Sequence, residues 1–129
     1  MLATDFTRML IRITNLPAGL DGLSAAGTVT QDEYRRALEP IVRAARAEQR
    51  SVRLVYELGP ELAPQAASSA WEDLRASIQY LRAFEGCAIV SDYEWIREAT
   101  RLVAPALPCP VRVFATHERD AAIAWLAAL

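Results

Sequence analysis

The first part of the chain contains two strand-like segments separated by a turn sequence. Residues 9–14 alternate in the period of two that is typical of a strand. Residues 15–19, Asn-Leu-Pro-Ala-Gly, follow with the composition of a hairpin loop. Residues 20–29 are rich in small residues and form a weaker strand pattern, which we expect to pair back on the first strand, with room for a bulge. The chain is therefore predicted to begin with a β-hairpin.

Three later segments place apolar residues at helical spacing, and each follows a Ser or Thr with a Glu three residues further on. In this capping-box pattern each side chain satisfies a backbone amide that the start of the helix exposes. The pairs are Thr30 with Glu33, Ser69 with Glu72 and Ser91 with Glu94. The first helix is expected to reach about Arg50 with a kink at Pro40, the second to end near Gly86, and the third to end at Pro105.

The third helix and a fourth one are each expected to bury an apolar face. The third helix places Trp95, Ile96 and Leu102 on the same side. The fourth helix is expected to begin at Thr116, whose hydroxyl can cap it, and to run to the C-terminus with Trp125 in the core.

Three short apolar runs lie between these helices, at residues 52–58, 87–90 and 111–114. Such runs are typical of strands that are buried on both faces. Strands that alternate with helices need right-handed crossovers and a largely parallel sheet, in which only the first strand is expected to run antiparallel. We therefore predict one α/β domain over residues 1–129, with a mixed, mostly parallel five-stranded sheet and about four helices.

The carboxyl ends of the parallel strands are the expected place for a site, because open sheets of this kind bind ligands beyond that edge. Glu57 ends a buried strand, where its charge is costly unless it is paired. We expect either Arg53 or Arg97 to pair with it, or Glu57 to face a site. The residues expected at this edge are Glu57, the irregular segment 59–67, Ser68, Ser69, Ser91, Asp92, Thr116 and His117.

Composition and charge exclude several classes of function. The formal net charge is −2 and no run of like charges occurs, so a nucleic-acid partner is not expected. The longest apolar run, residues 121–129, is far shorter than the roughly 20 residues of a membrane span, and the N-terminus lacks the pattern of a signal peptide. Cys87 and Cys109 lack the spacing of metal ligands and suit a reducing compartment. The sequence predicts a cytoplasmic protein without a metal or cofactor.

Five short sequences carry a resemblance to a known family. They are Val-Tyr-Glu-Leu-Gly-Pro at 55–60, Trp-Glu-Asp at 71–73, Val-Ser-Asp-Tyr-Glu-Trp-Ile at 90–96, Val-Arg-Val-Phe at 111–114 and Ala-Trp-Leu at 124–126. In this order and spacing the chain resembles the SpoIIAA-like proteins of bacteria, a branch of the STAS superfamily. The resemblance implies a small α/β domain of the anti-sigma-factor-antagonist type that acts by binding. A structural kinship to CRAL-TRIO lipid-binding domains keeps a ligand-binding role open.

The resemblance also implies a phosphorylation site. In anti-sigma-factor antagonists the phosphorylated Ser or Thr, typically in an Asp-Ser pair, lies where the second helix begins after the middle strand. Ser68 and Ser69 stand in that region, although the Asp is absent. A phosphate there would add about −1.5 to −2 charges at the positive end of a helix dipole. Capping of the helix by Ser69 is the simpler alternative.

Aromatic residues near the same edge suggest a pocket. Tyr56, Trp71 and Trp95 are candidates to wall an apolar cavity beneath residues 59–67. The uncharged segment 62–70 resembles a lid that opens or lies on a membrane surface. The candidate ligand-pocket residues are Tyr56, Glu57, Leu62, Trp71, Asp92 and Trp95.

The leading functional hypothesis is a non-enzymatic regulatory module that binds a protein partner at this edge. The alternative is an apolar small-molecule or lipid binder with peripheral membrane contact, and a homodimer also stays open. The least favoured hypothesis is a hydrolase whose catalytic residues are His117, Asp92 and either Ser68 or Ser69. Neither serine has the G-x-S-x-G setting of a nucleophile elbow, so no catalytic residue is predicted.

Overall fold

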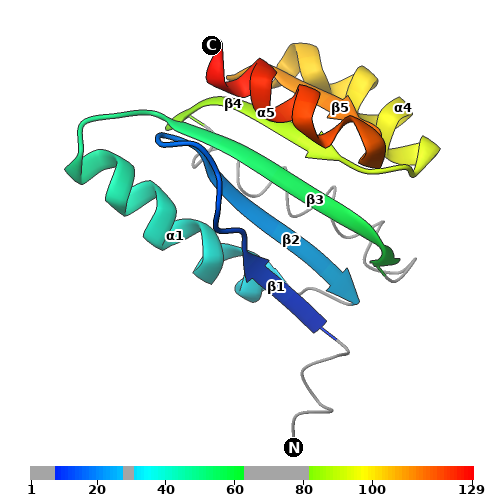
Figure 1. The fold of residues 1–129 in the computed structure, drawn as a ribbon, viewed down its shortest axis with the longest axis horizontal. Helices are drawn as coiled ribbons and strands as arrows, with labels where there is room; N and C mark the ends of the chain where they lie inside the picture. The colour runs from blue at the N-terminus through cyan, green and yellow to red at the C-terminus, as the bar shows by residue number, and fades with distance from the viewer. Residues whose placement is uncertain (1–7, 28–30, 63–81) are drawn as a thin grey trace, which may run out of the picture.

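The computed structural model describes residues 8–27, 31–62 and 82–129. Within these ranges five strands form one sheet in the order β1-β2-β3-β4-β5 (Figure 1). The strands are β1 (Arg8–Arg12), β2 (Asp21–Gly27), β3 (Val52–Leu62), β4 (Phe84–Val90) and β5 (Val111–Phe114). β1 runs antiparallel to β2, and all the other neighbouring pairs are parallel. The predicted mixed, mostly parallel five-stranded sheet is therefore confirmed.

Three α-helices are present in the described ranges: α1 (Gln31–Ala47), α4 (Glu94–Val103) and α5 (Arg119–Ala127). Pro40 lies inside α1, as predicted. Two short 3-10 turns, Ala104–Ala106 and Thr116–Glu118, follow α4 and β5. Thr30 and most of the predicted second helix, including Ser69 and Glu72, lie outside the described residues.

The helices cover both faces of the sheet (Figure 1). On one face Ile41 of α1 and Ile96 of α4 belong to the same buried cluster as Leu54 of β3. On the other face Leu126 of α5 packs in a cluster with Val55 of β3. Consecutive strand residues point to opposite faces, so the burial of both Leu54 and Val55 explains why this strand is apolar throughout.

β3 is longer than the sequence pattern predicted. It continues to Leu62, so residues 59–62 of the expected irregular segment belong to the strand. Its register with β2 shifts between Ala25, which pairs with Leu58, and Gly27, which pairs with Leu62. Pro60 lies within this irregular part, where its missing N–H costs the ladder little.

The predicted end of the second helix near Gly86 is wrong, because Phe84 and Gly86 already belong to β4. Phe84 is buried in the core, which anchors the start of this strand. A Cβ atom on Gly86 would overlap the side chain of Leu129. The glycine therefore makes room for the C-terminal residue on the sheet and does not end a helix.

The predicted capping box of Ser91 and Glu94 is also wrong. The residue before α4 is Tyr93, which has an extended backbone, and no side chain caps the helix. Ser91 is only 1% exposed, and its hydroxyl accepts a hydrogen bond from the Tyr93 N–H at 3.2 Å. The serine thus shapes the turn between β4 and α4.

The buried face of α4 differs from the predicted one. Leu102 is 82% exposed, whereas Thr100 is buried together with Ile96. Because Ile96 and Thr100 are four residues apart, they share a helix face that leaves Leu102 outside. Within the described part of the chain the Thr100 hydroxyl has no hydrogen-bond partner.

The start of the last helix was predicted one turn too early. Thr116 lies in a 3-10 turn, and α5 begins only at Arg119. At the turn, the Ala115 N–H donates to the Glu118 carboxylate at 2.8 Å. Trp125, which was predicted to lie in the core, is only partly buried; it packs against the core cluster, with its ring 5.9 Å from that of Phe114 between centroids.

Candidate functional site

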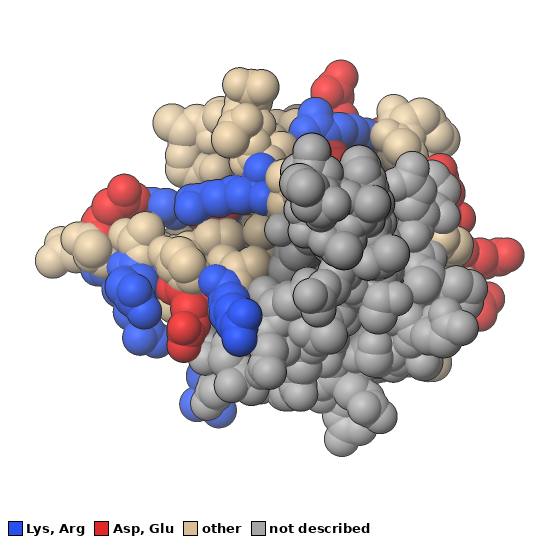
Figure 2. All heavy atoms as spheres, turned by 90° about the horizontal axis from the view of Figure 1, so that it is seen from below, with Lys and Arg blue, Asp and Glu red and all other residues tan. Residues whose placement is uncertain are grey.

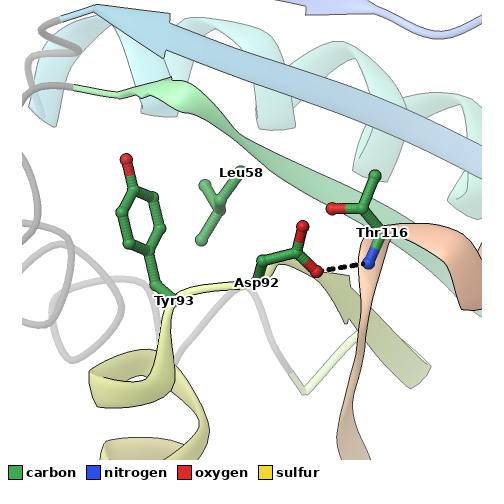
Figure 3. Close-up of a pocket in the computed structure, with 4 residues that line it drawn as sticks. All are labelled: Leu58, Asp92, Tyr93 and Thr116. Carbon is green, nitrogen blue, oxygen red and sulfur yellow. Dashed lines mark hydrogen bonds between the residues drawn. The ribbon is translucent and has the colours of Figure 1, made fainter.

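A hollow of about 180 Å³ lies at the carboxyl ends of three parallel strands (Figure 3). We call this space the rim hollow. The described residues that line it are Leu58, Asp92, Tyr93 and Thr116. Leu58 lies in the second half of β3, Asp92 and Tyr93 directly follow β4, and Thr116 follows β5. The three strands are parallel neighbours, so the segments after them meet at one edge. This is the edge at which the topology predicted a site.

The Asp92 carboxylate is held by the loop after β5. Its Oδ1 accepts a hydrogen bond from the Thr116 N–H at 2.8 Å, and its second oxygen is directed toward the hollow (Figure 3). The Thr116 N–H, and after it the Thr116 side chain, lower the pKa of Asp92. Burial opposes this lowering, and the nearby His117 and Arg97 lower the pKa by smaller amounts than burial raises it. Asp92 is therefore a fixed and ionised carboxylate at neutral pH.

Apolar groups form the other part of the hollow. Leu58 is buried, and the half-buried Tyr93 packs against the same core cluster (Figure 3). The Tyr93 ring lies 6.2 Å from the Trp95 ring between centroids, with the two planes tilted by 40°. The described lining thus combines the Asp92 carboxylate and the hydroxyls of Thr116 and Tyr93 with an aliphatic side chain and an aromatic ring.

Glu57 is paired, but neither predicted arginine is its partner. Its carboxylate forms an ion pair with Arg119 at the start of α5. Arg53 pairs with Glu85 instead, at 3.0 Å from Nε to Oε1. Arg119 lies 62 residues further along the chain, so only the fold brings it to Glu57.

The structure divides the predicted ligand-pocket residues between two faces of the sheet. Tyr56 packs on the cluster that contains Ile41 of α1, whereas its neighbour Glu57 pairs with Arg119 of α5 on the other face. Trp95 packs on the same cluster as Tyr56, and only Asp92 of the predicted set is among the described residues that line the hollow. Leu62 ends β3.

Three of the predicted site residues, Ser68, Ser69 and Trp71, lie outside the described residues, and their proposed roles stay predictions. Two residues that line the rim hollow, Leu58 and Tyr93, were not predicted from the sequence to be pocket residues. A signal for Leu58 existed, because it stands two residues after Tyr56 and therefore on the same strand face.

The thiols of the chain lie away from this hollow. Cys87 and Cys109 are both free and buried. Burial raises the pKa of Cys87 far above its usual range and that of Cys109 to about 11. Since the thiolate is the reactive form, both are poor nucleophiles. In the described ranges no three His, Cys, Asp or Glu residues are grouped as metal ligands would be.

The charged residues do not gather by sign on the face shown in Figure 2. Basic and acidic side chains are interleaved in the part of this face that is described. No helix in the described ranges is both long enough and apolar enough to cross a bilayer.

Comparisons with known proteins agree with this fold. The sequence model of the SpoIIAA-like family matches residues 22–127. No curated protein matches the chain. The crystal structure of an uncharacterized protein of the DUF3478 family from Shewanella loihica PV-4, with a SpoIIAA-like fold, has a TM-score of 0.63 and 21% identity, covering 92% of this chain and 93% of that chain. Because the family model spans most of the sequence, the chain belongs to the SpoIIAA-like family.

Proposed function

We propose that this protein is a non-enzymatic binding module, of the anti-sigma-factor-antagonist type, that binds a regulatory protein partner at the carboxyl edge of its parallel strands. Membership in a family whose fold is generally non-enzymatic supports the absence of catalysis. The observation that carries the proposal is the rim hollow, where Asp92 and Thr116 present polar groups beside the apolar Leu58 and Tyr93.

The chemistry of the described residues near this edge favours binding over catalysis. The Ser91 hydroxyl is buried and accepts a hydrogen bond from Tyr93, so it is not presented as a nucleophile. His117 is exposed beside Thr116, and no hydrogen bond joins it to Asp92 or Ser91 among the described residues. A nucleophile needs a base within hydrogen-bond distance, and the described rim contains no such pair.

The size of the hollow favours a partner's side chain over a lipid. Its volume of about 180 Å³ corresponds to roughly six water molecules at ~30 Å³ each. Pockets that enclose whole small molecules usually measure about 300–1,000 Å³. A single side chain that projects from a protein surface fits the smaller space, and the rest of the partner would lie on the surrounding loops.

Site-specific photo-crosslinking tests this proposal. A benzophenone amino acid replaces the exposed His117 at the rim or, as a matched control, the exposed Ala47 at the end of α1. Ala47 precedes the start of β3 by five residues, so it lies at the opposite edge of the sheet. After irradiation of the cells that produce the protein, we expect a discrete protein adduct from position 117 and none of that mass from position 47.

Charge reversal at the rim provides the second arm of the experiment. Asp92→Arg is expected to reduce the adduct at least about tenfold, whereas Glu39→Arg on the exposed surface of α1 leaves it unchanged. Equal adducts from positions 117 and 47, or an adduct that Asp92→Arg does not weaken, would contradict binding at this edge.

A further inference from the structure

We infer that the rim hollow receives a basic side chain of the partner, an arginine or a lysine, with its charged group on Asp92 and its aliphatic stem against Leu58 and Tyr93. This inference rests on the proposed function, since it names the chemistry of the group that the partner inserts.

Asp92 is a described carboxylate that lines the hollow and forms no ion pair with a described arginine. Four described carboxylates already pair with an arginine: Asp21, Glu48, Glu57 and Glu85. Asp92 has no ion pair within the described part of the chain, although Arg97 and His117 are near enough to lower its pKa. The hydrogen bond from the Thr116 N–H fixes its orientation, and Thr116 supplies no counter-ion. An arriving cation therefore finds a carboxylate already placed for a charge-assisted hydrogen bond.

The apolar side of the hollow suits the rest of a basic side chain. Arginine and lysine bury their methylene stems on apolar surfaces while the charged end stays polar. A cation over an aromatic face is attracted to it within about 6 Å of the ring centre. The protein already uses this contact elsewhere, because the Arg112 guanidinium lies 4.9 Å from the Phe114 ring centroid. In Figure 3 the Leu58 side chain lies between the Tyr93 ring and the Asp92 carboxylate, so the ring, which also packs against Trp95, is placed to contact the stem of a basic side chain rather than its charge.

An anionic group is a poor occupant of the same space. It would face Asp92 directly, and the low pKa of this residue keeps the charge in place at neutral pH. A neutral apolar group would leave the second oxygen of Asp92 facing an apolar contact. A basic side chain meets both surfaces of the hollow at once.

NMR titration with side-chain mimics tests this inference without knowledge of the partner. The probes are N-acetyl-argininamide and its citrulline analogue, which has nearly the same shape but no charge. We expect the arginine probe to give saturable shifts of the Asp92, Tyr93 and Thr116 amide signals. The citrulline probe should bind at least about tenfold more weakly, because hydrogen bonds to charged groups are roughly twice as strong as neutral ones.

Variants locate the effect at Asp92. Asp92→Asn keeps an oxygen for the Thr116 N–H but removes the charge, and it should reduce binding of the arginine probe to the level of citrulline. Glu39→Gln, at an exposed site on α1, should leave the shifts unchanged. The comparison of the two probes on the unmodified protein does not depend on how either variant folds.

Three outcomes would overturn the inference: equal binding of both probes, shifts that lie away from the rim, or stronger binding of N-acetyl-glutamate than of the arginine probe. If the crosslinking from position 117 still succeeds in that case, the basic side chain is wrong and the binding function stands. If the probes and the crosslinking both fail, the proposed function fails as well.

Discussion

The two ends of the parallel strands differ in how their charged side chains are paired within the chain. Where the strands begin, Arg53 donates hydrogen bonds to both Glu85 oxygens, at 3.0 and 3.1 Å, and to the carbonyls of Leu126 and Leu129, at 3.3 and 2.6 Å. Gly86 leaves space for the Leu129 side chain beside this cluster. We call this group of contacts the C-terminal latch, because it ties the last helix to β3 and β4.

Where the strands end, the contacts between described residues include the Glu57–Arg119 ion pair and the bond between Asp92 and Thr116. Asp92 and Thr116 share a single backbone hydrogen bond across the rim hollow, and both residues are exposed. The polar groups of the latch are satisfied within the chain, whereas Asp92 keeps a charge that no described residue pairs. The difference teaches that the closed end contributes contacts that stabilise the fold, whereas the open end is where we propose that a partner binds. The two properties should therefore respond to different substitutions.

The largest effect on stability is expected from Leu126→Ala. Leu126 is fully buried on α5, so the substitution removes apolar contacts and leaves a cavity. The free energy of unfolding should fall by about 2–5 kcal/mol in urea denaturation. Crosslinking from position 117 should persist wherever this variant stays folded. An unchanged free energy of unfolding, or loss of the crosslinked adduct from a folded variant, would contradict the view that stability and binding depend on different ends of the sheet.

A smaller loss of stability is expected when the latch is opened. Arg53→Met keeps the stem but removes the hydrogen bonds to Glu85 and to the end of α5. Because Arg53 is partly exposed, the free energy of unfolding should fall by only about 1–2 kcal/mol. Arg43→Met, on the exposed surface of α1, serves as the control and should change stability by less than about 0.5 kcal/mol. Equal costs for the two variants would show that the latch contributes nothing.

The smallest effect on stability is expected at the rim, and it depends on pH. The folded pKa of Asp92 lies below its ordinary value of 3.8, so its carboxylate stabilises the folded state above that pH. This contribution is lost as the pH falls through the lowered pKa. The difference in unfolding free energy between the natural protein and Asp92→Asn should therefore shrink between pH 7 and pH 3. An unchanged difference would contradict the hydrogen bond from Thr116 as the cause.

Much of the fold was predictable because its signals are local. The runs at 52–58, 87–90 and 111–114 are short and apolar, which identified three parallel strands, and their topology located the edge. The ends of elements were less predictable, because they depend on contacts with distant parts of the chain. Gly86 is the example, since the reason for a glycine there is Leu129.

The site was predicted in position but not in its contacts. Asp92 and Thr116 were assigned to the same edge, yet the bond between them joins residues 24 positions apart and depends on the packing of two loops. The partner of Glu57 was missed for the same reason. The separation of Tyr56 from Glu57 was available from the strand period of two, because adjacent residues of a strand face opposite sides.

Native mass spectrometry of the protein purified from its own cells tests the central claim most directly. The account predicts a complex with a second protein that is retained by Glu39→Arg and lost in Asp92→Arg. A small apolar molecule bound to both variants, with no protein complex, would contradict it.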